Sequence, residues 1–582
     1  MAKGSSGAIL TLFALVFAGP LVYLCRYIYN KYYGVKNTDD IETEMVNAST
    51  RSNDSSRSDT PPVAVDETTT ETEEEHTDSS NYLLSLLGYA IGIGNVWRFP
   101  YLVGQYGGGA FVFAYLVCLF LVAMPLFMVE LGLGQHTRLG SIGTMTSIAP
   151  RWRGLGWAQM GMVFVIVAYY NVLLAYSCIY VIASCVSPLP WESQGSEVYW
   201  DSDVLNSYPE GSAMGPVQWK LVVSLMVVYI GVFFAVGFGK KVLSDITWVT
   251  VLGPILLMVI LFCRTVGLPG ADEGIEFYLG KFDIAELYNA ELWATACGQI
   301  IFSLSPGCGT GIALSSKAHP KEDVYRVCIT VGLCNSAFSL FGGFAIFSIL
   351  GNLAYTTDQS VAVIASQSGT GLAFISIADG ITHFGSASNM MSVLFFVMLL
   401  SLGCDSTFAW LETLVAAVED MCRANNVHAT TSQIVGVLCV LLFIAGLPFC
   451  TRGGNQLLDV VDHFVGSWFL LFSCLLETIM FNVDFSWERY AALITKATVG
   501  NPNTPNGRTL HQYWRITVMY VVPIFTCALL LTEFINNAFV RQYGGGDYSQ
   551  ELLSVGWVVF FALVTIALST LVSQYLGEST TT

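Results

Sequence analysis

Charged residues are scarce in this 582-residue chain, at 12% of the composition, whereas 54% of the residues are hydrophobic. Soluble domains carry about a quarter charged residues, so the composition excludes an ordinary soluble protein. Charge-free runs such as 111–127, 221–236 and 555–572 approach the roughly 20 residues that cross the hydrocarbon core of a bilayer. The sequence therefore predicts an all-α protein that crosses a membrane many times.

The short motifs of common enzyme active sites are also missing. The chain contains no HExxH, no GxSxG, no GxxxxGK, and no Cys or His cluster at metal-ligand spacing. Nearly all of its 15 cysteines fall inside apolar runs, where Cys behaves as a small hydrophobe. We expect neither an enzyme nor a cofactor-binding protein, no nucleic-acid partner, and membrane lipids as the surroundings.

Basic residues are outnumbered, with 25 Lys and Arg against 43 Asp and Glu, which gives a formal charge of -18. Residues 37–80 hold much of this excess, because 13 acidic residues stand there against two Arg, a local charge of -11. This segment is rich in Ser and Thr and poor in aromatics, a composition that cannot bury enough surface to fold. We expect a disordered acidic linker.

Thirteen apolar segments follow one another along the chain. They are 8–29, 82–106, 109–137, 158–186, 219–237, 244–265, 290–316, 323–352, 389–423, 430–448, 455–482, 513–536 and 552–576. The loops between them alternate in charge, as the positive-inside rule requires. Basic residues mark one side: Arg138, Arg151, Arg153, Lys240, Lys241, Lys317, Lys321, Arg326, Arg489 and Arg508. That side is expected to be cytoplasmic, and the core helices are expected to begin from it.

The chain divides into four parts on this basis. Residues 1–36 form an extra N-terminal transmembrane helix, 37–80 the cytoplasmic linker, 81–577 the transmembrane domain and 578–582 a short cytoplasmic tail. The first apolar run also fits a secretory signal peptide. Positive charges that follow this run favour an uncleaved helix with its N-terminus outside.

Two of the segments contain residues that break helices. Three glycines lie within Gly88–Asn95, and a proline lies within Ser303–Gly309. Glycines in membrane helices more often serve close helix packing. Packing does not explain the polar residues at the same depth, Asn95, Gln299, Ser303 and Ser305, so we expect two helices that unwind beside a central site.

The stretch Gly88-Tyr-Ala-Ile-Gly-Ile-Gly-Asn-Val-Trp-Arg-Phe-Pro-Tyr101, followed by Gly107-Gly-Gly-Ala-Phe111, resembles the signature of the neurotransmitter:sodium symporter family. The resemblance continues through 299–309, 403–409 and 462–464, and it covers roughly 82–576. It implies a twelve-helix core built as a five-plus-five inverted repeat with two broken helices. It also implies symport with sodium, by alternating access, in the plasma membrane.

The resemblance further implies ion sites. One sodium would be held by Ala90, Asn95, Ser303 and Asn335; a second by Gly88, Ile91, Leu402, Asp405 and Ser406; and chloride by Tyr115, Gln299, Ser303, Asn335 and Ser339. Carbonyl, hydroxyl, amide and carboxylate oxygens suit a hard cation. Asp405 has a structural alternative as a packed, protonated acid. Chloride dependence is expected because chloride-independent members place an acid where Ser339 stands.

The substrate site implied by the resemblance consists of Ala90, Gly92, Ile93, Gly94, Ile166, Tyr170, Phe302, Ser303, Ser305, Cys308, Ser406 and Trp410. Gly92 stands where carriers of monoamines place an aspartate, so the resemblance favours an amino acid or γ-aminobutyrate-like solute. Tyr170 would donate its hydroxyl to the solute's carboxylate, although a tyrosine can also simply anchor a helix at the interface. Cys308 stands where the family commonly has a larger aromatic residue, and Trp410 stands where it commonly has a small or aliphatic one. These opposite changes in side-chain volume suggest a cavity that is displaced rather than enlarged.

Arg98 and Asp462 resemble the family's outer gate, although a pair near the membrane surface can be purely structural. Asp420 resembles the acid of the inner gate, but the sequence before the first core helix, Thr72-Glu-Glu-Glu-His-Thr-Asp78, lacks the expected Arg and Trp. The inner gate therefore either uses another cation or is loose. Two other functions stay open: a non-transporting solute sensor or scaffold, and a carrier of betaine- or taurine-like osmolytes.

Overall fold

The computed structural model describes residues 79–206, 215–280, 282–320, 322–365, 371–495, 505–537, 542–543 and 546–579. The expected extra helix and almost the whole acidic linker lie outside these residues. Within them, ten continuous helices are long and apolar enough to cross a membrane. Two interrupted helices bring the core to twelve, so the predicted all-α membrane fold with two broken helices is confirmed.

The first five crossings begin with a broken helix. They comprise α3 (Ser79–Ala90), η1 (Ile93–Asn95) and α4 (Arg98–Gln105); α5 (Gly109–Cys118), η2 (Leu119–Ala123) and α6 (Met124–Thr137); α8 (Arg153–Ser184); α11 (Trp219–Gly237); and α12 (Lys240–Thr265).

The next five begin in the same way. They comprise α14 (Ala290–Leu304) and α15 (Thr310–Ser315); α16 (Val324–Thr357); α19 (Ser388–Ala424); α20 (Thr431–Gly446) and η9 (Leu447–Cys450); and α21 (Gly454–Val461), η10 (Asp462–Phe469), α22 (Leu470–Met480) and η11 (Phe481–Phe485). Two more crossings close the order: α24 (Pro505–Ile516), η12 (Thr517–Val521) and α25 (Val522–Asn537), then α26 (Gln550–Ser579).

Short elements join the crossings. They are α7 (Ser141–Ile148), η3 (Pro150–Trp152), α9 (Pro190–Gln194), α10 (Ser196–Val198), η4 (Tyr199–Val204), α13 (Ala271–Ile275), η5 (Glu276–Gly280), η6 (Ile284–Tyr288), α17 (Val361–Ala365), η7 (Leu372–Ser376), α18 (Ile377–Thr382), η8 (Gly385–Ala387), α23 (Trp487–Thr495), and the paired two-residue strands β1 (Gln542–Tyr543) and β2 (Gly546–Asp547).

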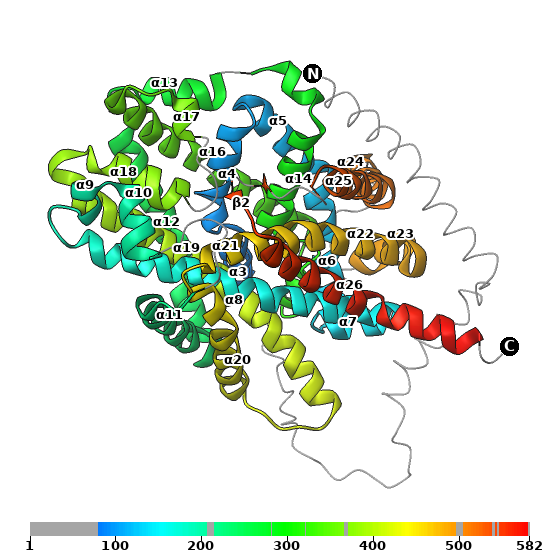
Figure 1. The fold of residues 1–582 in the computed structure, drawn as a ribbon. Helices are drawn as coiled ribbons and strands as arrows, with labels where there is room; N and C mark the ends of the chain where they lie inside the picture. The colour runs from blue at the N-terminus through cyan, green and yellow to red at the C-terminus, as the bar shows by residue number, and fades with distance from the viewer. Residues whose placement is uncertain are drawn as a thin grey trace, which may run out of the picture.

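The broken helices lie inside the bundle. The blue α3–α4 segment runs through the middle of Figure 1, and α3 packs against α12, α16 and α19. α8 and α19 lie against each other along much of their length. Large apolar side chains that stay exposed gather on outer helices, with Val249 of α12 72% exposed and Val558 of α26 68% exposed. Such faces suit contact with lipid tails, and the protected interior is left for polar groups.

Candidate functional site

The first break follows from the backbone freedom of glycine. α3 ends at Ala90, Gly92 is extended, and a single 3-10 turn over Ile93–Asn95 precedes α4. The Asn95 amide oxygen accepts a hydrogen bond from the Gly92 N–H at 3.0 Å, which stabilises the unwound turn. Carbonyl oxygens of an interrupted helix lose their helical partners, so this segment presents bare peptide groups to the interior.

The second break is held open by an acid. Ser305 takes a left-handed conformation with φ of 46°, and α15 begins only at Thr310. One carboxylate oxygen of the fully buried Glu130 accepts hydrogen bonds from the N–H groups of Gly307 at 2.9 Å and Gly309 at 3.0 Å. Sequence reasoning missed Glu130, although an acid inside the apolar run of α6 was a visible signal.

A polar cluster joins the two breaks to α16. The Asn95 amide nitrogen donates to Asn335 Oδ1 and to Ser339 Oγ, both at 2.7 Å, and Ser303 Oγ lies 3.1 Å from Asn335 Oδ1. Asn95, Asn335 and Ser339 are each no more than 1% exposed. The structure thus brings together the side chains expected for the first sodium and for chloride. Ala90, expected to offer its carbonyl, is the last residue of α3 and is buried.

The remaining residues expected to hold chloride lie beside this cluster. Gln299 donates from Nε2 to the Gly94 carbonyl at 3.3 Å, and its Oε1 has no hydrogen-bond partner among the described residues. The hydroxyl of Tyr115 lies 3.2 Å from Ser336 Oγ. Ser336, one turn before Ser339, was not expected from the sequence because nothing distinguishes it from other serines in membrane helices.

A second cluster surrounds Asp405, which is 4% exposed. Thr250 of α12 donates to one of its carboxylate oxygens, while Oδ2 has no hydrogen-bond partner within the described part of the chain. Gly88 lies alongside, where an added Cβ would be 3.2 Å from Asp405 Cγ. Ser406 donates to the Tyr89 carbonyl at 3.3 Å. Thr250 was missed, because a threonine in an apolar run carries no signal of its own.

The two other residues expected at this second cluster, Ile91 and Leu402, are both buried. Their expected contribution is a main-chain carbonyl. Ile91 stands in the non-helical step between α3 and η1, where such a carbonyl lacks its helical partner. An unpaired, buried carboxylate oxygen beside unwound backbone is costly unless a cation or proton compensates it.

Two of the expected substrate residues, Tyr170 and Ser406, lie against Gly92. A Cβ on Gly92 would be 2.7 Å from Ser406 Oγ and 3.3 Å from the Tyr170 hydroxyl, which accepts a hydrogen bond from the Ile93 N–H at 3.3 Å. A Cβ on Gly94, by contrast, would meet nothing within 4 Å. The space beside the first break therefore opens at Gly94 and is closed at Gly92.

Trp410 forms one wall beside Tyr170. The two rings meet edge to face with centroids 4.9 Å apart, and Trp410 also lies edge-on to Tyr89 at 6.2 Å. Tyr89 in turn donates to the Ser305 carbonyl at 3.3 Å, which links this wall to the second break. Cys308 and Ile166 are each 1% exposed. Trp410, the larger of the two residues that depart from the family, thus packs against Tyr170, the tyrosine expected to contact the solute.

Arg98 and Asp462 face each other at one end of the site, with Arg98 NH1 4.0 Å from Asp462 Oδ2. Tyr169 donates to Asp462 Oδ1 at 2.7 Å, and the Arg98 guanidinium lies 4.8 Å from the ring centre of Phe302. This ion pair is long, and both partners have other contacts. Phe302 stands on α14 two residues before that helix ends at the second break, so its contact with Arg98 links the pair to the break.

At the other end, Asp420 does not stand alone. Its Oδ2 accepts from the Gly140 N–H at 2.7 Å, and its Oδ1 lies 3.2 Å from Arg423 NH2 on the same helix. The sequence spacing of three residues could have shown this pairing.

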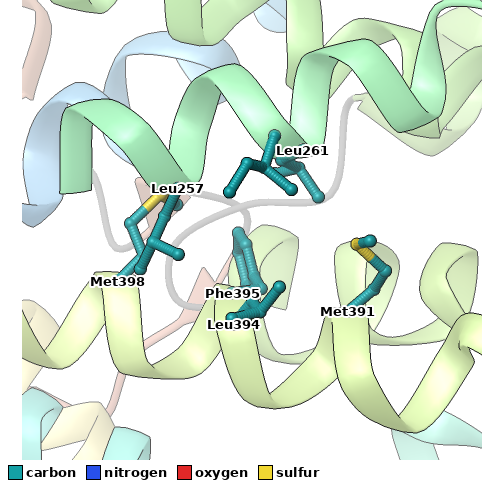
Figure 2. A pocket seen from close by; sticks show the side chains of 7 residues that line it. Leu257, Leu261, Met391, Leu394, Phe395 and Met398 are labelled. Carbon is teal, nitrogen blue, oxygen red and sulfur yellow. The ribbon is translucent and has the colours of Figure 1, made fainter. Parts of the chain in front are cut away.

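α12 and α19 also pack against each other away from Asp405. Leu257, Leu261, Met391, Leu394 and Met398 line an apolar seam between them that has no room for a water molecule (Figure 2). All of its lining side chains are apolar, so the seam offers no ligand to an ion or a charged solute.

Comparison with known proteins agrees with this arrangement. The model of the "Sodium:neurotransmitter symporter family" matches residues 73–199 and 192–577. The chain is 32% identical to a sodium-dependent serotonin transporter of Drosophila melanogaster, over 85% of this chain and 82% of the relative. It is 30% identical to the human sodium- and chloride-dependent neutral and basic amino acid transporter B(0+), over 85% and 84%. It is also 30% identical to the sodium- and chloride-dependent glycine transporter 2 of Xenopus laevis, over 86% and 69%. The chain therefore belongs to the sodium:neurotransmitter symporter family, whose members are secondary transporters and not enzymes.

Proposed function

We propose that the chain carries an amino acid, or a related small solute with a carboxylate, into the cell together with sodium and chloride. The observation that carries this proposal is the closure at Gly92. With Ser406 Oγ 2.7 Å and the Tyr170 hydroxyl 3.3 Å from the position of a Cβ, no acidic side chain fits there to pair with a substrate amine. A free carboxylate on the solute itself is the complementary group.

Hydrogen-bond donors for the carboxylate of the solute lie beside the unwound turn. The Tyr170 hydroxyl can donate to an anion while it accepts from the Ile93 N–H. α4 begins close by at Arg98, and the N-terminus of a helix favours a negative charge. Beyond Gly94, where an added atom would meet nothing within 4 Å, there is room for the solute.

Sodium binding is proposed at both polar clusters. One ion would take oxygens from Ala90, Asn95, Ser303 and Asn335, which requires the Asn95 amide to turn its oxygen toward Asn335. The other would take Oδ2 of Asp405 together with Ser406 and the carbonyls of Gly88, Ile91 and Leu402. The support for the second site is the buried carboxylate oxygen that has no hydrogen-bond partner among the residues that the structure describes.

Chloride is proposed beside the first sodium. Ser339 is neutral and Asn95, Gln299 and Tyr115 are uncharged, so no group of this cluster balances a bound cation. An external anion that accepts hydrogen bonds from these side chains would supply the missing charge.

Alternating access then needs gates at both ends. Arg98 and Asp462 would close over the solute from outside, and Asp420 belongs to the cytoplasmic end. We place the protein in the plasma membrane with the basic loops inside, in line with the positive-inside rule.

The test is uptake of radiolabelled amino acids by reconstituted vesicles, with sodium and chloride gradients varied independently. Uptake that needs both ions supports the proposal, and uptake that persists without sodium overturns it. Saturable solute binding without uptake would instead identify a sensor. Stronger competition by betaine or taurine than by any α-amino acid would identify an osmolyte carrier.

A further inference from the structure

The stretch after α15 is tied to the end of α6. Gln135 donates to the carbonyls of His319 at 2.9 Å and Glu322 at 3.0 Å, and Arg138 donates to the Ser316 carbonyl at 3.2 Å. These bonds hold the end of the second broken helix against the first half of the bundle. They reach main-chain atoms only, so they do not depend on the identity of the side chains in that stretch.

One side-chain ion pair connects the same stretch to α19. Lys317 Nζ lies 3.1 Å from Glu412 Oε1, and the side chains are only 27% and 16% exposed. Burial lowers the pKa of Lys317, but Glu412 and Glu419 raise it by more, so the net shift is upward and the ammonium stays charged. The pair is therefore a partly buried contact between two charges, and removing one partner leaves the other charge poorly solvated.

The position of Glu412 links the pair to the ion site. Glu412 follows Asp405 by seven residues on α19, which is two helical turns, so both carboxylates lie on the same face. Lys317 follows α15, the second half of the broken helix that contributes Ser303 and Ser305 ahead of its break. The ion pair thus joins the helix bearing Asp405 to the end of the second half of a broken helix.

Asp420 does not make such a connection. It is bound by the Gly140 N–H and by Arg423 of its own helix, and Arg423 is 67% exposed. The residues 72–78 that precede the first core helix contain four acids and no Arg or Lys. Among the described residues, Lys317 is thus the cation that reaches from α15 to an acid of α19.

Chain crossings place this pair opposite the Arg98–Asp462 pair. α4 and α15 each follow the break of a helix. Between the end of α4 and the end of α15 the chain makes five crossings, the last of them α14–α15 itself, so the two helices end on opposite sides of the membrane. We propose that Lys317 and Glu412 form the lock that keeps the cytoplasmic end of the pathway closed, in place of the cation absent from residues 72–78. That the lock closes a transport pathway rests on the proposed function, whereas the contact that it makes between α15 and α19 does not.

Hydrogen–deuterium exchange of the purified full chain tests the lock without transport. Lys317→Gln and Glu412→Gln should each speed amide exchange in α15 by roughly tenfold or more, because the helix end is released. The charge-swapped double variant, Lys317→Glu with Glu412→Lys, should bring exchange back to within about threefold of the wild type. Arg515→Gln, which breaks the exposed pair with Glu488, is the matched control and should change nothing in α15.

Unchanged exchange in both single variants would overturn the proposal, and so would a double variant that exchanges as fast as the singles. Exchange in α26, far from the pair, reports general loss of fold. If a single variant exchanges faster in α26 and the charge-swapped double variant does not, the double variant still counts as a rescue. If the lock behaves as expected while vesicles show no uptake, the proposed function fails and the lock stands.

Discussion

The carboxylate of Asp405 lies directly against the backbone of Gly88, where an added Cβ would be 3.2 Å from both Cβ and Cγ of the acid. Gly88 sits inside α3, two residues before the helix ends. This close approach gives Gly88 a packing role, the alternative explanation for a glycine in a membrane helix. It also brings the backbone of α3 near the carboxylate oxygen that has no partner among the described residues.

Gly88→Ala should weaken sodium dependence. The new methyl group would meet Val251 Cγ2 at 2.8 Å and push α3 away from Asp405, so the sodium concentration for half-maximal uptake should rise by about tenfold. Gly253→Ala is the matched control, because its Cβ would meet nothing within 4 Å. An unaltered sodium dependence in Gly88→Ala would show that the approach of α3 to Asp405 is irrelevant to binding.

Gly92→Ala should lower solute affinity, since its methyl group would crowd Ser406 Oγ and the Tyr170 hydroxyl. We expect KM to rise by roughly tenfold or more while the protein stays folded. Gly94→Ala, whose Cβ has open space, should raise KM less. An equal rise in KM in the two variants would contradict the proposal that the carboxylate of the solute binds beside Gly92.

Ser339→Glu should free uptake from chloride. The new carboxylate would stand where Ser339 accepts from the Asn95 amide at 2.7 Å, and it would supply the negative charge that chloride otherwise brings. Uptake measured in gluconate should then be within about twofold of uptake in chloride, whereas wild-type uptake in gluconate should nearly vanish. Ser336→Glu, one turn earlier, is the comparison. Continued chloride dependence in Ser339→Glu would oppose the proposed anion site.

Trp410→Gly should change which solutes compete best. Loss of the ring beside Tyr170 opens space at that wall, so bulkier amino acids should gain on small ones in competition uptake by roughly tenfold. Trp468→Phe, a buried ring on η10 outside the site, should leave the ranking as it is. The same ranking in Trp410→Gly as in the wild type would remove Trp410 from the determinants of specificity.

Local chemistry made both helix breaks predictable. Gly92, Gly94 and Pro306 disfavour a continuous helix wherever they occur, and polar neighbours at the same depth pointed to a site. Asp405 was predictable for a similar reason, because a carboxylate in an apolar run must have a purpose or a partner. The resemblance then indicated how such residues are grouped, and in the structure Asn95 bonds to Asn335 in one cluster while Asp405 bonds to Thr250 in the other.

Partners distant in the chain were not predictable. Thr250 and Asp405 stand far apart in the sequence, as do Glu130 and the amides of Gly307 and Gly309, and Lys317 and Glu412. No spacing rule joins such residues, because their contact depends on how whole helices pack. The pairing of Asp420 with Arg423, three residues apart, was within reach of sequence reasoning.

Equilibrium binding of ²²Na⁺ to the purified protein tests the central claim most directly, because it needs neither a known solute nor a membrane. The wild type should bind sodium saturably at both clusters, Asp405→Asn should lose the site at Asp405 and keep the one at Asn95, and Glu488→Gln, at an exposed pair, should match the wild type. Sodium binding by Asp405→Asn with the same number of sites as the wild type would contradict the account.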